Sequence, residues 1–260
     1  MLRFIIANLL CSTIALAGQD KLAEYAVNHP ERLASDRQYD INRQPIKVLN
    51  FFDVRPGMTV IDVFSGRGYY SELAALMVGE KGKVIAHNNK AYIDYLKDSA
   101  TSRYINRLAN VETVSLEANE LTFAHNSADI VFLFLSFHDI YYRPDNGSWP
   151  TIDKNRFLSG IFNSLKPGGT LAIIDHHALE SAGTKAGHSL HRIPKTIVIK
   201  ELTEAGFKLT GEATFLENSE DDLAKHMYSA EIRGKTSRFV LKFIKPFSAP
   251  EQMREQRDIP

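Results

Sequence analysis

The residues best suited to bind a ligand follow a short apolar run, Val60 to Val63. Such a run is typical of a buried parallel strand. Asp62 stands at its end, where a carboxylate can receive an ammonium group, and Ser65, Gly66 and Gly68 form the turn that follows. Two glycines let the backbone turn sharply and let a ligand approach without a Cβ in the way. The predicted helix start beyond them offers free N–H groups and the positive end of a dipole.

The spacing within this turn bears on the kind of ligand. A dinucleotide site requires a third small residue in the pattern G-x-G-x-x-G and a pyrophosphate on the helix start. Here the third position is Ser71, and Phe64 stands two residues before Gly66. A ligand with an amino-acid moiety, such as S-adenosylmethionine, suits Asp62 better than a pyrophosphate does. The plainer alternative is a strand–helix turn that glycines tighten and that binds nothing.

A second group of residues with titratable side chains follows another apolar run, residues 129–136. His138 and Asp139 come after it, and ligands of open α/β sheets bind at the carboxyl ends of strands. A titratable pair there is a candidate for acid–base work, with His138 or His191 as the base and Asp139 orienting it. The alternative is that the pair only satisfies backbone groups of a loop.

A long segment with little periodicity, residues 176–194, contains His176, His191 and Arg192. A loop of this length in a compact domain is usually functional or disordered. We expect this segment and the pair at residues 138–139 to bind the acceptor of a transferred group, because both segments leave the carboxyl ends of central strands.

The same histidines and carboxylates raise the question of a metal site. Imidazole and carboxylate suit divalent ions, and the residues that could contribute are His138, Asp139, Asp175, His176 and His191. Unpaired histidines in loops are commoner than metal ligands, so no metal is predicted.

Strands and helices alternate along the chain, as they do in doubly wound sheets. Apolar runs and turn residues predict strands at residues 60–63, 83–86, 111–116, 129–136, 170–175, 206–216 and 238–244. Helical spacing predicts helices at residues 69–77, 91–108, 153–165 and 195–205. The expected fold is α/β, a Rossmann-like seven-stranded and mostly parallel sheet with helices on both faces and an antiparallel last strand.

Two further strand ends could contribute to the ligand site. Asn88 lies 20 positions after Gly68, where an acidic residue would normally hold the ribose hydroxyls. An amide can bond a hydroxyl, but more weakly than a carboxylate. Glu117 and Ala118 fall where adenine-contacting residues would lie, unless Glu117 is simply a solvated loop carboxylate.

The termini differ from the rest of the chain. Residues 1–17 have the pattern of a signal peptide, with Arg3, a short apolar stretch and an Ala-x-Ala site ending at Ala17. The only cysteine, Cys11, lies in this stretch. We expect a periplasmic or otherwise exported protein; the alternative is an apolar helix that a cytoplasmic protein retains. The expected divisions are a signal peptide at 1–17, a helical cap or lid at 18–57, the sheet domain at 58–246 and a mobile tail at 247–260.

Charge and length narrow the range of partners. Lys+Arg and Asp+Glu both number 31, so no global charge indicates a nucleic acid. The apolar stretch near the start is too short for a bilayer, which takes about 20 residues. We therefore expect a small-molecule acceptor, no nucleic acid and no membrane span after signal cleavage.

The order of these motifs resembles a class I S-adenosylmethionine-dependent methyltransferase. The motifs, in order, are Asp62-x-x-x-Gly66-x-Gly68, Val84-x-Ala86-x-Asn88, Glu117-Ala118, the strand from Asp129 and Leu165-Lys-Pro-Gly-Gly169. Phe64 replaces the first glycine of the family's motif. The resemblance implies S-adenosylmethionine binding around Asp62, Gly66, Gly68, Asn88 and Glu117, and it implies little about the acceptor.

A narrower resemblance is to a family of predicted bacterial methyltransferases that often carry a signal peptide and whose substrate is not settled. The matching runs are Phe137-His138-Asp139-x-Tyr141-Tyr142, Asp175-His176-x-Ala178, Leu190-His191-Arg192-Ile193, Glu204-Ala205-Gly206-Phe207 and Arg233-Gly-Lys-Thr-x-Arg238. Ser237 stands where that family is expected to have Asp, which leaves one salt-bridge partner of the loop open.

Three functions compete on these residues. The first is transfer of a methyl group to an oxygen, nitrogen or carbon acceptor, in which the protein mainly positions the acceptor and removes a proton. The second is an exported, non-catalytic domain that kept the fold and binds a ligand, which Phe64 and Asn88 favour. The third is a Rossmann dehydrogenase, which Ser71 and the missing acid at position 88 disfavour.

Overall fold

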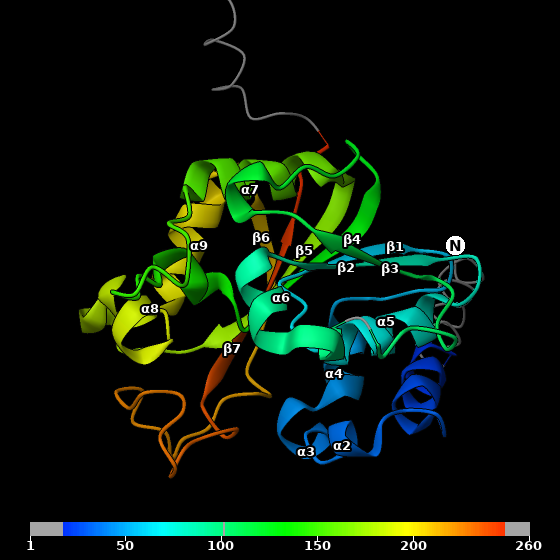
Figure 1. Cartoon of the computed structure of the whole chain (residues 1–260), viewed down its shortest axis with the longest axis horizontal. Coiled ribbons are helices and arrows are strands. Elements are labelled where there is room, and N and C mark those ends of the chain that lie inside the picture. Colours follow the sequence, from blue (N-terminus) through cyan, green and yellow to red (C-terminus); the bar gives the residue numbers. More distant parts are fainter. Residues whose placement is uncertain (1–17, 101, 248–260) are drawn as a thin grey trace, which may run out of the picture.

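The protein, described by a computed structural model over residues 18–100 and 102–247, is built on one seven-stranded sheet. The strand order is β3-β2-β1-β4-β5-β7-β6 (Figure 1). The first five strands pair in parallel, and β7 runs antiparallel to both of its neighbours. The order reverses between β1 and β4, so the carboxyl ends of these two strands flank the point where such sheets bind ligands. The expected fold class is confirmed.

The strands alternate with helices over most of the chain. The strands are β1 Thr59–Val63, β2 Lys83–Asn88, β3 Val111–Ser115, β4 Ala128–Phe134, β5 Leu165–His176, β6 Lys208–Ala213 and β7 Arg238–Ile244. The main helices after β1 are α5 Tyr69–Val78, α6 Lys90–Leu96, α7 Lys154–Ser164, α8 Lys185–Leu190 and α9 Lys195–Glu204. Short 3-10 turns η1 Lys97–Ala100, η2 Ala118–Glu120, η3 Phe137–Tyr141 and η4 Glu180–Ala182 complete the connections.

Two apolar layers cover the two faces of the sheet. On one face, Phe157 of α7 and Val198 of α9 pack with Val131 of β4. On the other face, Leu73 of α5 packs with Phe132 of β4. Buried side chains on both faces explain why β4 reads as an unbroken apolar run rather than an alternating one.

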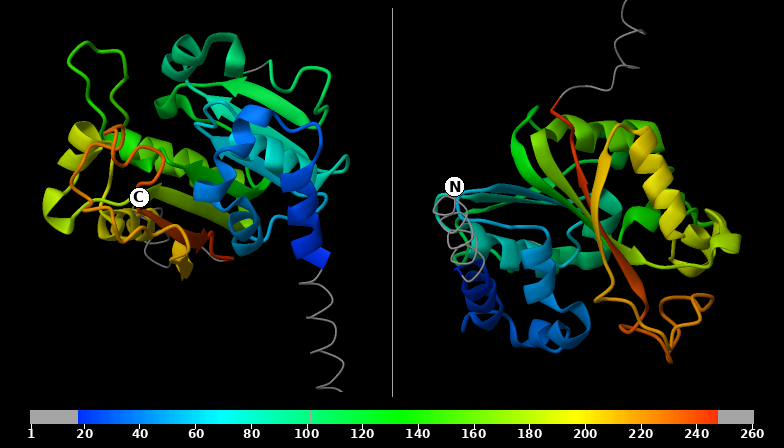
Figure 2. Two further views of the ribbon diagram at one scale, coloured as in Figure 1. Left: turned by 90° about the horizontal axis from the view of Figure 1, so that it is seen from below. Right: turned by 180° about the vertical axis from the view of Figure 1, so that it is seen from behind.

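The residues before β1 are helical and add to the α5 side of the sheet. Residues 18–28 form a helix, followed by α2 Ala34–Arg37, α3 Asp40–Arg43 and α4 Pro45–Phe51. Ala23 and Ala26 of the first helix and Leu49 of α4 belong to the same buried cluster as Leu73. These blue helices lie beside α5 in Figures 1 and 2, so the segment expected to cap the sheet packs on it.

Several predicted boundaries differ from the structure. The helix expected over residues 91–108 ends at Leu96, where Lys97 takes a positive φ of 50° and breaks the helical path. The long loop over residues 176–194 contains η4 and α8. The predicted signal peptide, residues 1–17, and the tail after Phe247 lie outside the described residues. Across 18–100 and 102–247, no helix has the length and apolar character needed to cross a membrane.

Candidate active site

The glycine turn follows β1 directly, as expected, and the carboxyl end of β2 supports it. The Ser65 N–H donates to the His87 carbonyl at 2.8 Å, and the Gly68 N–H donates back to the Ser65 carbonyl at 2.9 Å. Gly66 and Gly68 have φ values of 57° and 79°, which residues with a Cβ rarely adopt. Gly68 then caps the start of α5. The turn therefore presents backbone at the carboxyl end of the central strand.

Asp62 lies at the base of this turn, with only 3% of its surface exposed. Its Oδ2 accepts a hydrogen bond from the Ser71 hydroxyl at 2.5 Å. Burial raises the pKa of this carboxyl to about 7, against the opposing effect of the Ser71 hydrogen bond. No ion pair to Asp62 occurs among the described residues. A ligand's ammonium group would therefore be stabilised by pairing with this carboxylate.

Asn88 is fully occupied in bracing the turn. Its Oδ1 accepts from the Gly66 N–H at 2.9 Å, and its Nδ2 donates to the Ser65 hydroxyl at 3.2 Å and to the Gly66 carbonyl at 3.1 Å. The side chain is 5% exposed. The structure thus gives Asn88 a role that the sequence did not indicate, because an Asp here could not make the two donations.

Glu117 and Ala118 stand at the carboxyl end of β3, beside the start of α6. The Glu117 Oε1 accepts from the Lys90 N–H at 3.2 Å, and Ala118 is buried. Glu117 therefore contacts the helix that follows β2. Like Asn88, Glu117 lies at the edge of the sheet formed by the carboxyl ends of the strands.

A cover formed by Arg103 and Tyr104 closes over the glycine turn. The Arg103 guanidinium donates to the Gly68 carbonyl at 2.9 Å and pairs with Asp36 at 2.9 Å and Glu72 at 3.0 Å. A Cβ placed on Gly68 would lie 1.8 Å from the Tyr104 hydroxyl oxygen. A ligand that approached this glycine from its Cβ side would therefore have to displace the cover.

Phe64, which stands where the resembled family has glycine, has a left-handed φ of 55°. That conformation costs a bulky residue roughly 1–2 kcal/mol. Its ring is held by contacts with Phe157, Tyr92 and Trp149, at centroid distances of 5.5, 5.6 and 5.5 Å. The conformation explains why glycine suits this position, and the aromatic contacts explain how Phe64 is tolerated.

His138 lies at the start of η3 and is held by a carboxylate from the next strand. Its Nδ1 is 2.7 Å from Asp175 Oδ1, and its backbone N–H donates to Asp175 Oδ2 at 2.8 Å. Its Nε2 lies 3.3 Å from Asp139 Oδ1. We expected Asp139 to orient the histidine; Asp175 holds Nδ1, and Asp139 faces the other nitrogen.

The charges of this trio are set by burial and by one another. Burial alone would lower the pKa of His138, but the charges of Asp175 and Asp139 outweigh it and raise that pKa to about 9. Burial raises the pKa of Asp139 to about 6, although the charge of His138 opposes the shift. At neutral pH the ring of His138 is therefore positively charged, and it faces Asp175 on one side and Asp139 on the other.

His191 joins the group from the end of α8. Its Nδ1 lies 3.9 Å from Asp139 Oδ1, and its ring lies 5.4 Å from that of His138 and 4.4 Å from that of Tyr142. Burial, together with the charge of His138, lowers the pKa of His191 to about 4. His191 is the most exposed of the three predicted catalytic residues, with 16% of its side chain accessible.

The other two loop residues expected at this site have different surroundings. His176 is buried, and its Nδ1 lies 2.6 Å from the Thr236 hydroxyl. Arg192 is fully buried and makes two hydrogen bonds to Asp221, at 2.8 and 3.0 Å. Asp221 also accepts from the Ser237 N–H at 2.6 Å. Asp221 thus supplies the carboxylate that the departure at position 237 left open, and Arg192 holds the loop.

Two aromatic residues not singled out as site residues connect the glycine turn with the histidine group. The Tyr92 hydroxyl donates to Asp139 Oδ2 at 3.0 Å, and the Trp149 indole N–H donates to the Asp139 carbonyl at 3.1 Å. Both rings also contact Phe64. The sequence signal for Trp149 was only its position in the loop after β4, and Tyr92 gave none.

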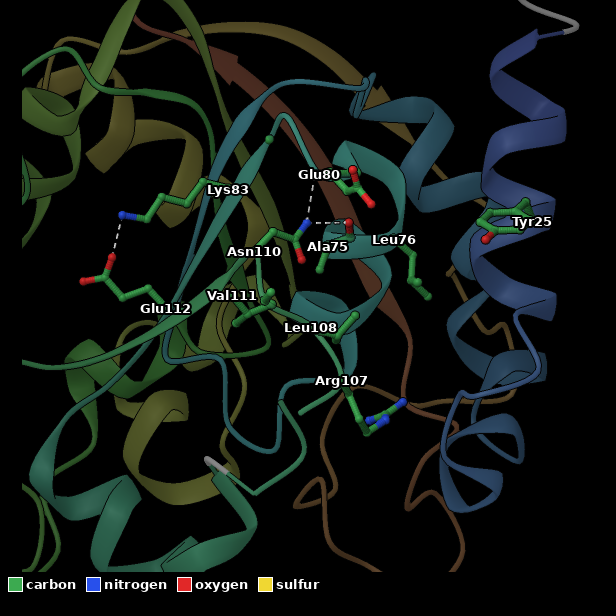
Figure 3. Close-up of a pocket in the computed structure, with 13 residues that line it drawn as sticks. Tyr25, Ala75, Leu76, Glu80, Lys83, Arg107, Leu108, Asn110, Val111 and Glu112 are labelled. Carbon is green, nitrogen blue, oxygen red and sulfur yellow. Dashed lines mark hydrogen bonds and ion pairs between the residues drawn. The ribbon is translucent and has the colours of Figure 1, made fainter. Parts of the chain in front are cut away.

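A cavity of about 750 Å³ lies elsewhere (Figure 3). It is lined by Lys83 at the start of β2, Val111 at the start of β3 and Tyr25 of the first helix. In Figure 3 the Asn110 amide points at the end of α5, where it donates to the Ala75 carbonyl at 2.9 Å. These are amino ends of parallel strands, opposite to the end that carries Gly68 and His138.

Comparison with known proteins places this geometry in a family. The family described as "Methyltransferase domain" matches residues 55–226, more than half of the chain. The chain therefore belongs to the methyltransferase-domain family. Its cofactor is S-adenosyl-L-methionine, in agreement with a structural neighbour, the SAM-dependent methyltransferase from Aquifex aeolicus.

Individual relatives are distant. That Aquifex structure is 25% identical, has a TM-score of 0.55, and covers 76% of this chain and 88% of its own. The ubiquinone/menaquinone biosynthesis C-methyltransferase UbiE of Hydrogenovibrio crunogenus is 25% identical over 181 residues, which are 68% of this chain and 66% of that protein. The match thus spans slightly less than two thirds of the relative's length.

One structural neighbour shows that the fold alone does not fix the reaction. The [4+2]-cyclase SpnF has a TM-score of 0.51 and 16% identity, and the alignment covers 83% of each chain. Identity this low supports the fold only, so the acceptor must be argued from this chain's own site.

The residues around the glycine turn fit the donor in part. Asp62 offers a buried carboxyl without a cationic partner among the described residues, and the turn at Gly66 and Gly68 offers close approach to backbone. Asn88 does not offer a free amide, because the turn uses both ends of its side chain.

Proposed function

We propose that the protein transfers a methyl group from S-adenosyl-L-methionine to a small-molecule acceptor bound at His138, Asp139 and His191. The donor supplies an electrophilic methyl group on a sulfonium centre. The chain's task is then to hold the acceptor in line with that group and to receive a proton where the acceptor loses one.

The observation that carries this proposal is the short connection between the two groups of residues. Phe64, which belongs to the glycine turn, contacts Tyr92, whose hydroxyl donates to Asp139. Both groups lie at the carboxyl ends of neighbouring strands, β1 and β4. A donor on the turn and an acceptor at Asp139 would therefore lie at the same edge of the sheet, at the ends of adjacent strands.

The surroundings of Asp139 favour an acceptor with an aromatic ring. Tyr142 and Trp149 lie beside it, and the Tyr142 ring is 4.4 Å from that of His191. Flat rings of this kind pack well against another aromatic molecule. The curated relatives named as ubiquinone/menaquinone biosynthesis C-methyltransferases support the same class of acceptor, although at only 25% identity.

We assign the proton-accepting role to His191 rather than His138, and the surroundings of the two rings support this choice. Both ring nitrogens of His138 face carboxylates, Asp175 at 2.7 Å and Asp139 at 3.3 Å. His191 is partly exposed and has one nitrogen directed at Asp139, at 3.9 Å. Asp139 then helps to position His191 and binds the polar group of the acceptor.

Two measurements test the proposal. Calorimetry with S-adenosylmethionine, S-adenosylhomocysteine and NAD is expected to show binding of the first two and none of NAD. A screen of phenols and quinols with isotopically labelled donor is then expected to give a methylated product, with turnover lowered about 10²–10⁴-fold in His191→Asn. Donor binding without transfer to any acceptor class would favour the non-catalytic alternative, which no comparison supports, and binding of NAD alone would refute the donor.

A further inference from the structure

His138, Asp139 and His191 bring together donor atoms from two segments of the chain. One atom from each residue can be chosen so that all three lie within 4.8 Å of one another. His138 Nε2 and Asp139 Oδ1 are 3.3 Å apart, and His191 Nδ1 is 3.9 Å from the same oxygen. Donors about 2.1 Å from a tetrahedral ion stand about 3.4 Å from one another. Two of the three separations are thus close to what an ion requires.

We propose that these three side chains bind a divalent first-row transition-metal ion through His138 Nε2, Asp139 Oδ1 and His191 Nδ1. Two imidazoles and one carboxylate are a ligand set that zinc and iron ions share in proteins. Three protein ligands leave at least one coordination position open.

The residues behind the ligands are arranged as metal sites arrange them. His138 Nδ1 is paired with Asp175 Oδ1 at 2.7 Å, which directs Nε2 away from that carboxylate and toward Asp139. Metal-bound histidines commonly hold their second nitrogen on a carboxylate in this way, because the pairing fixes the ring and strengthens the ligand. Tyr92 likewise holds Asp139 Oδ2, the oxygen that the ion would not use.

The backbone at His191 also serves to aim its ring. His191 ends α8 with a left-handed φ of 50°, where a helix usually has Gly or Asn. Such a conformation persists only where the surroundings impose it, and here the neighbouring residue Arg192 is fixed by two hydrogen bonds to Asp221. A rigid loop therefore delivers the third ligand.

Charge supports a cation at this point. Asp139 and Asp175 both face His138 and are buried. A divalent ion that displaces the proton from His138 Nε2 would be balanced by the charges of these two buried carboxylates. An oxygen of the acceptor would occupy the open position, where the ion would lower the pKa of a hydroxyl and would replace His191 as the group that promotes loss of its proton. Metal binding itself does not depend on methyl transfer.

The test is metal binding by the full chain after treatment with a chelator. Zn²⁺ is titrated calorimetrically, and Co²⁺ is used as a spectroscopic probe of low-symmetry coordination. We expect one equivalent of Zn²⁺ and visible Co²⁺ bands. His191→Asn and Asp139→Asn should each raise the Kd on the order of 100-fold or more, since each removes a ligand.

The control is His125→Ala, which removes an exposed histidine that precedes β4, whereas His138 and Asp139 follow the other end of that strand. It should bind Zn²⁺ as the wild type does. Melting temperatures in chelator establish that the variants are folded; Asn suits the left-handed backbone at 191. Failure of the wild type to bind Zn²⁺, or undiminished binding in both ligand variants, would overturn the proposal. The titration contains no S-adenosylmethionine, so either result leaves the separate test of methyl transfer unaffected.

Discussion

Replacing Asp62 by Asn should make the protein more stable and its donor binding weaker. The carboxyl is 3% exposed and has a pKa of about 7, against 3.8 in the unfolded chain. Because the folded pKa is the higher one, the group stabilises the fold at low pH, and this contribution is lost as pH rises from about 4 to about 7. The three-unit difference corresponds to roughly 4 kcal/mol at pH 8. Asn carries no charge and keeps an oxygen for the Ser71 hydroxyl, so the variant avoids that loss.

The assay compares the free energy of unfolding of wild type and Asp62→Asn at pH 4.5 and pH 8, pH values chosen to lie on either side of most of the titration. Between pH 4.5 and pH 8 the variant's advantage should grow by about 3 kcal/mol, or roughly 6–12 °C in melting temperature. S-adenosylmethionine should bind the variant about 10–150-fold more weakly, since a charge-assisted contact contributes about 1.5–3 kcal/mol. Asp145→Asn, at an exposed position, is the matched control.

The reasoning has two separate points of failure. A stability difference that does not change with pH would mean that Asp62 is not held in an unfavourable environment. Unchanged donor affinity would mean that the ammonium group is held elsewhere, even if the stability result is as expected.

Three other changes test the surroundings of the site. Gly68→Ala should lower the free energy of unfolding in urea by more than Gly66→Ala does. Both positions require a positive φ, but only the Cβ at position 68 would meet Tyr104, at 1.8 Å. Equal losses in the two variants would contradict the closed cover. Asn88→Asp should lower the melting temperature and weaken donor binding in calorimetry, since it removes two donations that brace the turn, and tighter binding would show that a ribose contact dominates. Arg192→Met should cost about 3–5 kcal/mol in urea unfolding, because it leaves a buried carboxylate unpaired; a loss under 1 kcal/mol would remove its structural role.

Much of the fold could be predicted from the sequence because the positions of the strands along the chain follow from local patterns. The bounds of β7, Arg238–Ile244, agree with the predicted range, since polar residues bound the apolar run on both sides. The helix expected to reach residue 108 was wrong, because no Gly or Pro marks its end at Leu96 and a lysine takes the positive φ. Sequence periodicity does not record a left-handed residue of an ordinary type.

The location of the candidate residues in the fold was predictable, and their contacts were less so. Placement of His138 and His191 at one end of the sheet followed from strand ends, and the structure brings both to Asp139. The hydrogen bond between His138 and Asp175 could not be predicted from spacing, because it depends on the side-chain direction at the end of β5. The same is true of Asn88, whose amide turns inward to the glycine turn rather than outward.

The closed cover over the glycine turn has a consequence for the timing of donor binding. Arg103 ties Asp36 of the N-terminal helices to Glu72 of α5 and to the Gly68 carbonyl. If donor binds only to molecules in which these contacts are open, the apparent affinity falls by the fraction that is open. The association rate would then reach a plateau with donor concentration, set by how often Arg103 releases. The N-terminal helices would thereby govern how quickly the site fills and empties, although they lie outside the sheet that holds it.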